Sequence, residues 1–290
     1  MTTQLTLIHA LTPLHAGTGQ AVGAIDLPIA RERPTGIPLL PGSSIKGALR
    51  ARTADPAWRT EIFGPETANA SDHAGAVQFS DAHLLLLPVR SLWGTFAWVT
   101  SPYLLQRFAR DLREAGITMK LPRPPASLEQ CLVPPGGALR GDPPGRVVLE
   151  DLDFAPDERP ELTQLAGQLD QWLHADEPPQ ARHHLCVVHD DVMSTLMETA
   201  TEVRARIALD DELKTVKRGA LWYEESLPCE SVLFGLTTAT DGWARGGAGR
   251  KAGELLAHLA REVGDTTLQL GGKATVGRGV CRVRFIGGAA

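Results

Sequence analysis

Asp26 and His15 lie in a glycine-rich stretch, residues 15–50, and are the side chains there best suited to chemistry. Asp26 stands in a span that holds no other acid until Glu32, and a carboxylate can act as a general base or hold a divalent ion. Histidine is a natural partner for proton transfer. From residue types alone, a turn-capping aspartate and a hydrogen-bonded loop histidine also fit.

Glycine-rich turns surround these two residues. The stretch contains Gly17, Gly19, Gly23, Gly36, Gly42 and Gly47. Glycine lets the backbone approach a ligand closely, and successive free N–H groups form anion-binding concavities. Residues 41–44 predict a turn into a helix with Ser43 or Ser44 as N-cap, and Lys46 follows within one turn. The basic residues that could extend this track are Arg31, Arg33 and Arg50.

A second glycine-rich segment, residues 271–279, also offers backbone N–H groups to an anion. Its residues suited to such contact are Gly271, Gly272, Lys273 and Arg278. A loop of this kind between strands either cradles a phosphate or is a flexible hairpin turn. The earlier GSSIKG turn is not a nucleotide-hydrolysing loop, because its glycine spacing differs and no Ser or Thr follows Lys46.

Charged and aromatic residues are mixed over residues 214–226, which predicts an exposed hairpin or arm. The side chains concerned are Lys214, Lys217, Arg218, Trp222, Tyr223, Glu224 and Glu225. Cations beside aromatic rings suit single-stranded RNA, since bases stack on rings while cations meet phosphates. The alternative is a hairpin whose aromatic rings pack into the body of the protein.

The segment HHLCVVHDD, residues 183–191, has the residue types of a metal site without its spacing. In a strand, His184 and Cys186 share one face, but the preceding histidine does not. No second cluster follows at the spacing of zinc sites. A strand followed by a helix over 192–203, with Asp190 or Asp191 as N-cap, explains the segment more simply.

The charge of the chain is unevenly distributed. Its 290 residues carry a net charge of −5 and are 43% hydrophobic. Residues 31–59 hold six basic and two acidic side chains, residues 245–290 hold eight and three, and residues 141–203 hold three and fourteen. A local basic surface attracts a phosphate backbone whatever the total charge, although charge is uneven along many chains.

Cysteine usage and hydropathy bear on the compartment. The four cysteines are scattered without a C-x-x-C pair, which favours a reducing compartment over a disulfide framework or zinc ribbon. No apolar run is long enough to span a bilayer, and no basic-then-apolar leader opens the sequence. We therefore expect a cytoplasmic protein without a membrane partner.

The fold class follows from the irregular alternation of strand and helix patterns, which indicates α+β rather than a doubly wound sheet. Strand patterns cover residues 5–14 and 77–87, and an amphipathic helix pattern covers 101–115. Residues 122–145 are rich in Pro and Gly, which predicts an irregular excursion rather than a second core.

Four segments carry a resemblance to a known family. They are GAIDLPIARERPTG with IPLLPGSSIKGALR near the N-terminus, RSLWGTFAWVTSPYLLQRF at 90–108, GALWYEESLP at 219–228 and LQLGGKATVGRG at 268–279. In this order they resemble the RAMP superfamily, and more closely the repeated backbone subunit of type III-B (Cmr) CRISPR effector complexes. The first and last segments indicate only the superfamily, whereas the middle two favour the III-B subunit over its III-A relative.

This resemblance implies a fold. A single RAMP domain over 1–290 would contain a modified ferredoxin-like (RRM-like) palm. A thumb hairpin would cover 204–228, with inserted segments at 55–100 and 122–182, the latter Pro/Gly-rich and acidic.

The resemblance also implies an activity. In III-B backbone subunits the aspartate that matches Asp26 is required to cut target RNA. RNA carries its own nucleophile, the 2′-OH, so an enzyme needs only in-line geometry, proton removal and charge neutralisation. Asp26 would serve as a base or hold a divalent ion, Mg²⁺ or Mn²⁺. His15, Tyr223 and either Glu224 or Glu225 would support the cut.

RNA contacts and partners follow from the same resemblance. The matching RNA-binding positions are Gly42, Ser43, Ser44, Lys46, Arg50, Arg31, Lys217, Arg218, Trp222, Gly271, Gly272, Lys273 and Arg278. The expected partners are a CRISPR guide RNA, a target single-stranded RNA, head-to-tail copies of the chain and other CRISPR effector subunits. Several copies would cut the target at regular intervals. The alternatives are a non-catalytic RNA-binding scaffold and a stand-alone guide-processing endoribonuclease.

Overall fold

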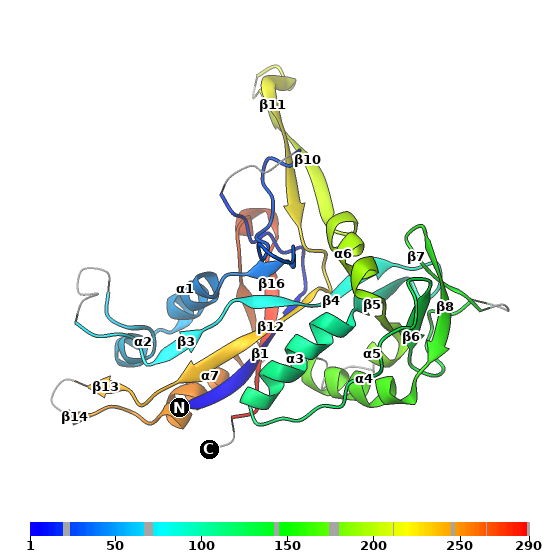
Figure 1. Ribbon diagram of the computed structural model, residues 1–290. Coiled ribbons are helices and arrows are strands. Elements are labelled where there is room, and N and C mark those ends of the chain that lie inside the picture. Colours follow the sequence, from blue (N-terminus) through cyan, green and yellow to red (C-terminus); the bar gives the residue numbers. More distant parts are fainter. Residues whose placement is uncertain are drawn as a thin grey trace.

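A large, mostly antiparallel sheet with helices against both faces forms the body of the protein, and a long hairpin projects from it (Figure 1). This computed structural model describes residues 1–19, 24–66, 72–141, 145–173, 180–210, 212–244, 247–264 and 266–288. Strands and helices are mixed along the chain, so the predicted α+β class is confirmed. A ferredoxin-like palm within this sheet stays a prediction.

Twelve strands make up the sheet, in the order β15-β16-β1-β12-β4-β5-β9-β6-β8-β7, with β2 beside β4 and β3 beside β12. Parallel pairing occurs between β5 and β9 and between β6 and β8. The strands are β1 (Thr2–Ala10), β2 (Leu39–Leu40), β3 (Val77–Phe79), β4 (Ala82–Arg90), β5 (Phe96–Thr100), β6 (Gln130–Val133), β7 (Val147–Leu149), β8 (Leu152–Glu158), β9 (Leu185–Val187), β12 (Val232–Ala239), β15 (Thr267–Gln269) and β16 (Val280–Ile286).

Helices cover both faces of the sheet. They are α1 (Gly42–Arg52), α2 (Pro56–Phe63), α3 (Pro102–Glu114), α4 (Pro160–Leu173), α5 (Ala181–His184), α6 (Asp190–Thr199) and α7 (Ala252–Val263). The alternation of β1 sends Leu5 and Leu7 into the core beneath α3 and α4, and Ile8 into the core beneath α1 and α7. No described helix is both long and apolar enough to cross a membrane.

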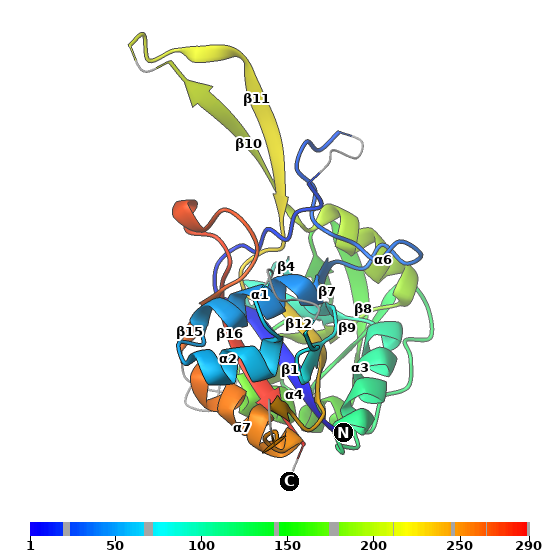
Figure 2. The ribbon, with the colours of Figure 1, turned by 90° about the vertical axis from the view of Figure 1, so that its left-hand side faces the viewer.

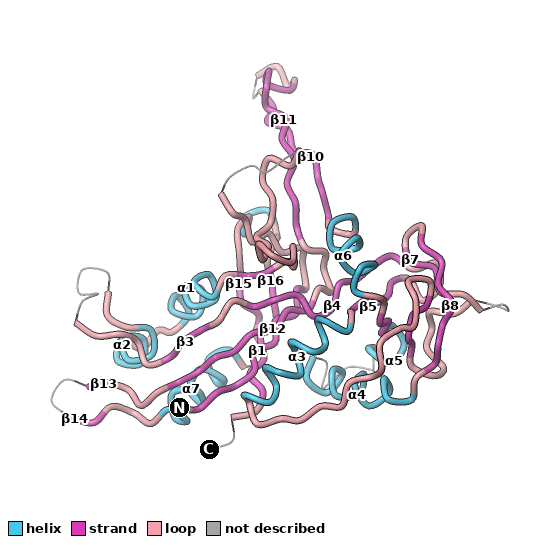
Figure 3. The backbone as a smooth tube through the Cα atoms, viewed as in Figure 1, coloured by secondary structure: helices cyan, strands magenta, loops and turns pink. Residues whose placement is uncertain are grey.

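The projecting hairpin consists of β10 (Glu202–Leu209) and β11 (Val216–Ser226). Figure 2 shows the hairpin rising from the body, with the loop that follows β1 on one side of its base and the loop between β15 and β16 on the other. A second, short hairpin joins β13 (Trp243–Ala244) to β14 (Gly247–Ala248). The backbone trace in Figure 3 shows how much of the chain around the base of the long hairpin is loop.

Several helices and strands begin or end at other residues than the sequence predicted. The 5–14 pattern is strand only as far as Ala10, and the 77–87 pattern is broken between β3 and β4. The 192–203 pattern is split, because α6 ends at Thr199 and the chain then enters β10. Neither predicted aspartate is the N-cap of α6; His189 accepts from the Asp191 N–H. Asp190 instead accepts from the backbone N–H of Tyr103, at the start of α3.

The two proposed insertions contain parts of the central sheet. Within 55–100 lies β4, whose four consecutive leucines, residues 84–87, are completely buried. The prediction of an irregular excursion over 122–145 is wrong for β6, a strand that joins β8 and β9 and whose Cys131 and Leu132 are fully buried. Residues 142–144 of that segment lie outside the described part of the chain.

Candidate active site at the base of the hairpin

An open groove of about 670 Å³ lies where three segments meet below the hairpin. We call it the groove. Its walls come from the loop after β1, from α1, and from the loop between β15 and β16. The lining residues are His15, Ala16, Gly17, Gly19, Leu27, Pro28, Pro41, Ser44, Gly47, Ala48, Gln269, Gly271, Gly272 and Lys273. The two glycine-rich segments singled out in the sequence are therefore neighbours in space.

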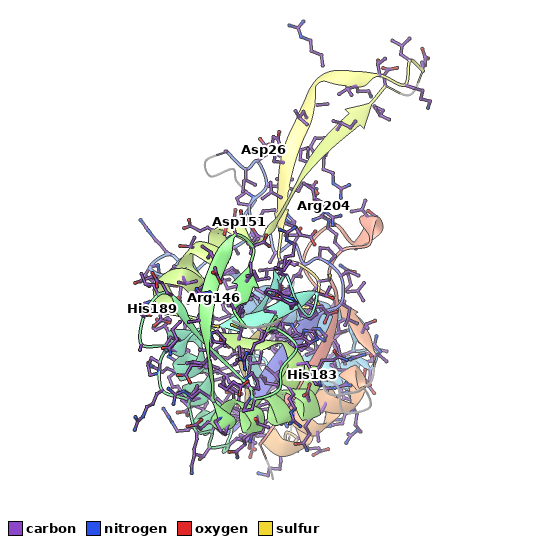
Figure 4. All side chains as sticks on the ribbon, turned by 90° about the vertical axis from the view of Figure 1, so that its right-hand side faces the viewer. Asp26, Arg146, Asp151, His183, His189 and Arg204 are labelled. Carbon is purple, nitrogen blue, oxygen red and sulfur yellow. The ribbon has the colours of Figure 1, made fainter. Side chains whose placement is uncertain are left out.

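Asp26 is fixed against the base of β11. Its Oδ2 accepts a hydrogen bond from the backbone N–H of Tyr223 at 2.8 Å. On either side of this bond, the Leu27 N–H donates to the Tyr223 carbonyl at 3.0 Å, and the Glu225 N–H donates to the Leu27 carbonyl at 3.0 Å. Asp26 itself is exposed, and Figure 4 shows it beside the hairpin. The carboxylate is thus anchored through one oxygen and open to solvent.

Glu225 holds the Asp26 loop in place from inside the protein. Its carboxylate accepts from the backbone N–H of Ile29 at 3.0 Å, from Arg31 at 2.6 Å and from the hydroxyl of Thr201 at 3.0 Å. Arg31 also donates to the carbonyls of Gly36 and Met197. Because the glutamate is buried and the arginine is engaged on three sides, both residues act here as internal tethers.

Glu224 holds the loop between β15 and β16 in place in the same way. Its carboxylate accepts from Lys273 at 2.7 Å, from the Trp222 indole at 2.8 Å and from Arg206 at 3.3 Å. Burial would raise the pKa of Glu224, but the hydrogen bonds from Lys273 and Trp222 and the nearby positive charges outweigh it and lower the pKa to about 2. Adjacent residues of β11 therefore hold the two loops that form the groove.

His15 lies in the wall of the groove and is buried. Its Nδ1 is 2.6 Å from the backbone carbonyl of Glu225. A carbonyl oxygen can only accept, so Nδ1 carries the proton and donates. The backbone carbonyl of His15 accepts from the Gly272 N–H at 2.8 Å. A side chain at Gly271 would put its Cβ 2.5 Å from that carbonyl, which requires glycine there.

The start of α1 packs against the protein and also lines the groove. Pro41 is its N-cap residue, so the predicted Ser43 or Ser44 cap is wrong. The Gly42 N–H donates to the Asp81 carboxylate at 2.8 Å, and Gly42 is buried against the backbone after β3. Ser44 lines the groove.

The three basic residues of α1, Lys46, Arg50 and Arg52, differ in their surroundings. Within the described residues, Lys46 has no hydrogen bond or ion pair. Arg50 donates to the carbonyls of Gly64 and Pro65, which ties α1 to the end of α2. Arg52 donates to the carbonyl of Glu262 at 3.0 Å, so within the described residues Lys46 is the basic residue of α1 whose cation is available to an anionic ligand.

The hairpin carries charged and aromatic side chains near its tip and near its base. Lys217 and Arg218 lie exposed near its tip, and Tyr223 is 41% exposed near its base. Arg204 and Arg206 share the face of β10 that pairs with Glu224 and Trp222. Sequence analysis missed these two arginines, although their alternation with apolar residues is the period-2 signal of a strand. They add positive charge above the loop that carries Lys273.

Arg278, predicted to bind RNA, is 2% exposed. Its guanidinium donates to the hydroxyl of Ser226 at the end of β11. Burial, together with the nearby charges of Arg206 and Arg204, lowers the pKa of Arg278. In this structure the residue joins the glycine loop to the base of the hairpin rather than facing the groove.

The described residues hold no group of three or more side chains placed to bind a metal. In the HHLCVVHDD segment, His184 contacts the carbonyl of Phe96 and His189 caps α6. Mg²⁺ is commonly held by one or two carboxylates, with waters and substrate phosphates as its other ligands. Asp26 fits that role as a single protein ligand, because Glu224 and Glu225 are committed to internal contacts.

Comparison with known proteins places the chain in a family. The family model described as the RAMP superfamily matches residues 7–282. The chain belongs to the RAMP superfamily. A relative from Pyrococcus furiosus, "CRISPR system Cmr endoribonuclease Cmr4", is 33% identical over 283 residues, which are 95% of this chain and 93% of the relative. The resemblance to the III-B backbone subunit is thereby confirmed.

Solved structures agree with this RAMP assignment. "Crystal structure of oligomeric Cmr4 from Pyrococcus furiosus" matches with a TM-score of 0.76 and 27% identity, covering 99% of this chain and 98% of that one. A chain of "Cryo-EM structure of the Type III-B Cmr-beta bound to cognate target RNA" matches with a TM-score of 0.73 and 21% identity, covering 98% and 97%. This second likeness shows that the fold is shared.

Proposed function

We propose that this RAMP protein is a backbone subunit of a type III-B CRISPR effector that binds guide RNA and cuts complementary target RNA. The observation that carries the proposal is the position of Asp26, an exposed carboxylate that is fixed by the Tyr223 N–H and directly precedes Leu27 in the groove wall. The relative that is 33% identical bears the name endoribonuclease. Asp26 is the available carboxylate at this place in the described chain.

The proposed chemistry uses the 2′-OH of the target as nucleophile. It attacks the adjacent phosphorus, the bond to the 5′-oxygen breaks, and the products carry a 2′,3′-cyclic phosphate and a 5′-hydroxyl. Asp26 takes the proton of the 2′-OH, directly or through water, and the leaving 5′-oxygen takes up a proton from water. A divalent ion at Asp26 would neutralise charge on the phosphate. The tethers through Glu225 and the backbone of Tyr223 keep the carboxylate still, so less orientational freedom is lost when RNA binds.

The groove is suited to an RNA backbone rather than to specific bases. Five of its fourteen lining residues are glycine, which lets a sugar–phosphate chain approach the protein backbone closely at those positions. Ser44 and Lys273 supply polar groups in the lining, and Lys46 lies on the same helix as Ser44. Contacts of this kind fix the register of a nucleic acid without reading its sequence. Base pairing between guide and target would supply the specificity, as in DNA-targeting effectors.

Assembly into a row of copies would repeat the Asp26 site along one guide. A head-to-tail interface generates such a row, whereas a two-fold dimer closes on itself. We expect several copies, joined by other effector subunits, to cut the target at regular intervals with Mg²⁺ or Mn²⁺ in a reducing cytoplasm. The P. furiosus relative of known structure is named as oligomeric.

A non-catalytic scaffold is the second candidate. The observation that favours it is the engagement of Glu224 and Glu225, which leaves Asp26 without another free carboxylate from β11. A stand-alone guide-processing endoribonuclease would need no partner subunits and would cut precursor repeats.

The test compares the chain alone with the reconstituted complex. The chain is given precursor repeat RNA, and the complex is given a guide and a labelled complementary target, each with Mg²⁺, with Mn²⁺ or with EDTA. We expect evenly spaced target products from the complex with either ion, and none with EDTA. Guide-dependent target binding without cuts would support the scaffold, and cutting of precursor by the chain alone would support the processing enzyme.

A further inference from the structure

His15 presents a hydrogen-bond acceptor to the groove. Its Nδ1–H is committed to the Glu225 carbonyl at 2.6 Å. In a neutral imidazole the other nitrogen, Nε2, then has a lone pair and no proton. Within the described residues, no protein group bonds Nε2, and it is not among the fully buried polar atoms that lack a partner. The side chain is 6% exposed, so Nε2 reaches solvent only through the groove.

The space in front of Nε2 is kept open by glycine. A Cβ at Gly17 would lie 2.7 Å from Nε2, closer than real carbon atoms approach. At Gly272 an added Cβ would be 3.5 Å from the ring carbon Cδ2. Both glycines line the groove with His15. A ligand in the groove can therefore come within hydrogen-bond distance of this nitrogen.

While the imidazole is neutral, only a donor can satisfy Nε2. Phosphate oxygens at neutral pH accept hydrogen bonds, so the phosphates that suit the rest of the groove do not suit this nitrogen. The sugar hydroxyl that distinguishes RNA from DNA is a donor, and it lies beside the phosphates along the same backbone. We propose that His15 Nε2 accepts a hydrogen bond from a ribose 2′-OH, and that His15 makes the groove selective for RNA over DNA. The inference rests on the proposed RNA-binding function, and the ribose can belong to the guide or to the target.

This role makes His15 a specificity residue and requires no proton transfer to it. A neutral hydrogen bond contributes about 0.5–1.5 kcal/mol net, or roughly two- to thirteenfold in affinity. RNA should therefore bind the wild-type chain about two- to thirteenfold more tightly per contacted ribose than the same sequence with 2′-deoxy or 2′-fluoro sugars, which lack the donor.

The variant that isolates Nε2 is His15→Asn. The side-chain NH₂ of asparagine can take the place of Nδ1–H and keep the bond to the Glu225 carbonyl, but nothing replaces Nε2. His15→Gln is the complement, because its amide oxygen can reach the position of Nε2. His183→Asn is the matched control, since His183 is exposed and lies far from the hairpin in Figure 4.

The experiment measures affinity by fluorescence anisotropy for one labelled RNA and its 2′-deoxy and 2′-fluoro forms. We expect the wild-type chain and the His183→Asn variant to prefer the 2′-OH form, the His15→Asn variant to bind all three within twofold, and the His15→Gln variant to keep part of the preference. In the assembled complex, single 2′-deoxy positions are placed first in the guide and then in the target. Loss of affinity in one arm identifies which strand contributes the ribose.

The possible outcomes distinguish a failure of the His15 role from a failure of the proposed RNA-binding function. Equal affinity of the wild-type chain for all three sugars, with RNA still bound and cut by the complex, overturns the role of His15 alone. So does a preference that survives in a folded His15→Asn variant. Absence of any RNA binding by chain and complex overturns both the role and the proposed function.

Discussion

Glu224→Gln should release the glycine loop between β15 and β16 from the base of the hairpin. The glutamate is 2% exposed and accepts hydrogen bonds from Lys273, Trp222 and Arg206. Glutamine keeps the shape of the side chain but loses the charge that attracts the two cations. The same tether would also be lost on protonation of the native glutamate, so acid should reproduce the effect of the substitution.

The size of the effect follows from the pKa. A lowering from 4.5 to about 2 corresponds to about 3 kcal/mol, at 1.36 kcal/mol per pKa unit. The side chains of Lys273 and Arg206 are 32% and 35% exposed, so water screens part of this interaction. We therefore expect the glutamine variant to lose about 1–2 kcal/mol at pH 7.

The dependence on pH has a definite sign. Below about pH 4.5 the unfolded chain holds a proton on Glu224, whereas the folded protein takes one only near pH 2. The stabilisation is therefore complete above about pH 4.5 and declines as the pH falls toward 2. The difference in stability between wild type and Glu224→Gln should shrink across that window, because the variant has no carboxylate to titrate.

Hydrogen exchange of residues 268–279 and urea unfolding at pH 7 and at pH 3.5 provide the assay. The matched control is Glu198→Gln, since Glu198 is exposed on α6. A double-mutant cycle with Lys273→Met should give a coupling of at least 0.5 kcal/mol. Unchanged exchange of the loop, or a stability difference that stays constant with pH, would refute the reasoning.

Three further outcomes are expected from the tethers and the free cation. Arg31→Met should loosen the Asp26 loop, because it removes the bond to Glu225. In the assembled complex, target cutting should fall at least tenfold while guide affinity stays within threefold of wild type. Cutting equal to that of the wild-type complex would count against the tether. Lys46→Ala should leave the urea midpoint of unfolding unchanged and reduce the salt slope of RNA binding by about one. Arg50→Ala should in addition lower the free energy of unfolding by about 1 kcal/mol, because it removes the bonds to the end of α2. Identical behaviour of the two variants would contradict the structure. Gly271→Ala should destabilise the protein by about 1–3 kcal/mol, because φ is +71° and a carbonyl lies in the way, and a normal melting temperature would show otherwise.

The sequence was informative about which residues gather at the site. The glycine-rich context predicted anion contact for residues 15–50 and 271–279, and His15 and residues 271–273 line one groove. Asp26 is bonded to Tyr223 and directly precedes Leu27 of the groove wall, whereas its catalytic role was implied only by the family resemblance. Glycine marks places where backbone comes close to something, and that signal is local. The sequence could not show that at Gly42 the close neighbour is the protein's own backbone after β3.

The tethers could not be predicted, because they join residues far apart in the chain. Glu225 meets Ile29 across 196 positions, and Glu224 meets Lys273 across 49. Nothing in the local pattern distinguishes a buried glutamate that holds a loop from a catalytic one. The same limitation applied to Arg31 and Arg50, whose positive charge predicted RNA contact but whose guanidinium groups bond to the protein.

The short strands of the middle region were missed for a related reason. β6 and β7 have four and three residues, and strands of this length show too few alternations to give a pattern. Proline and glycine around them predicted irregular chain. These segments form strands because they pair with β8 and β9. Such pairing joins segments distant in the sequence, so the local pattern does not reveal it.

The most direct test of the central claim is target cutting by the reconstituted complex carrying Asp26→Asn in every copy, in Mg²⁺ beside the wild-type complex. Asparagine keeps the acceptor for the Tyr223 N–H but loses the charge and the basicity of the carboxylate. The account predicts that guide and target binding stay within threefold while the spaced products disappear. Undiminished cutting by the Asp26→Asn complex would contradict it and move the catalytic centre elsewhere in the assembly.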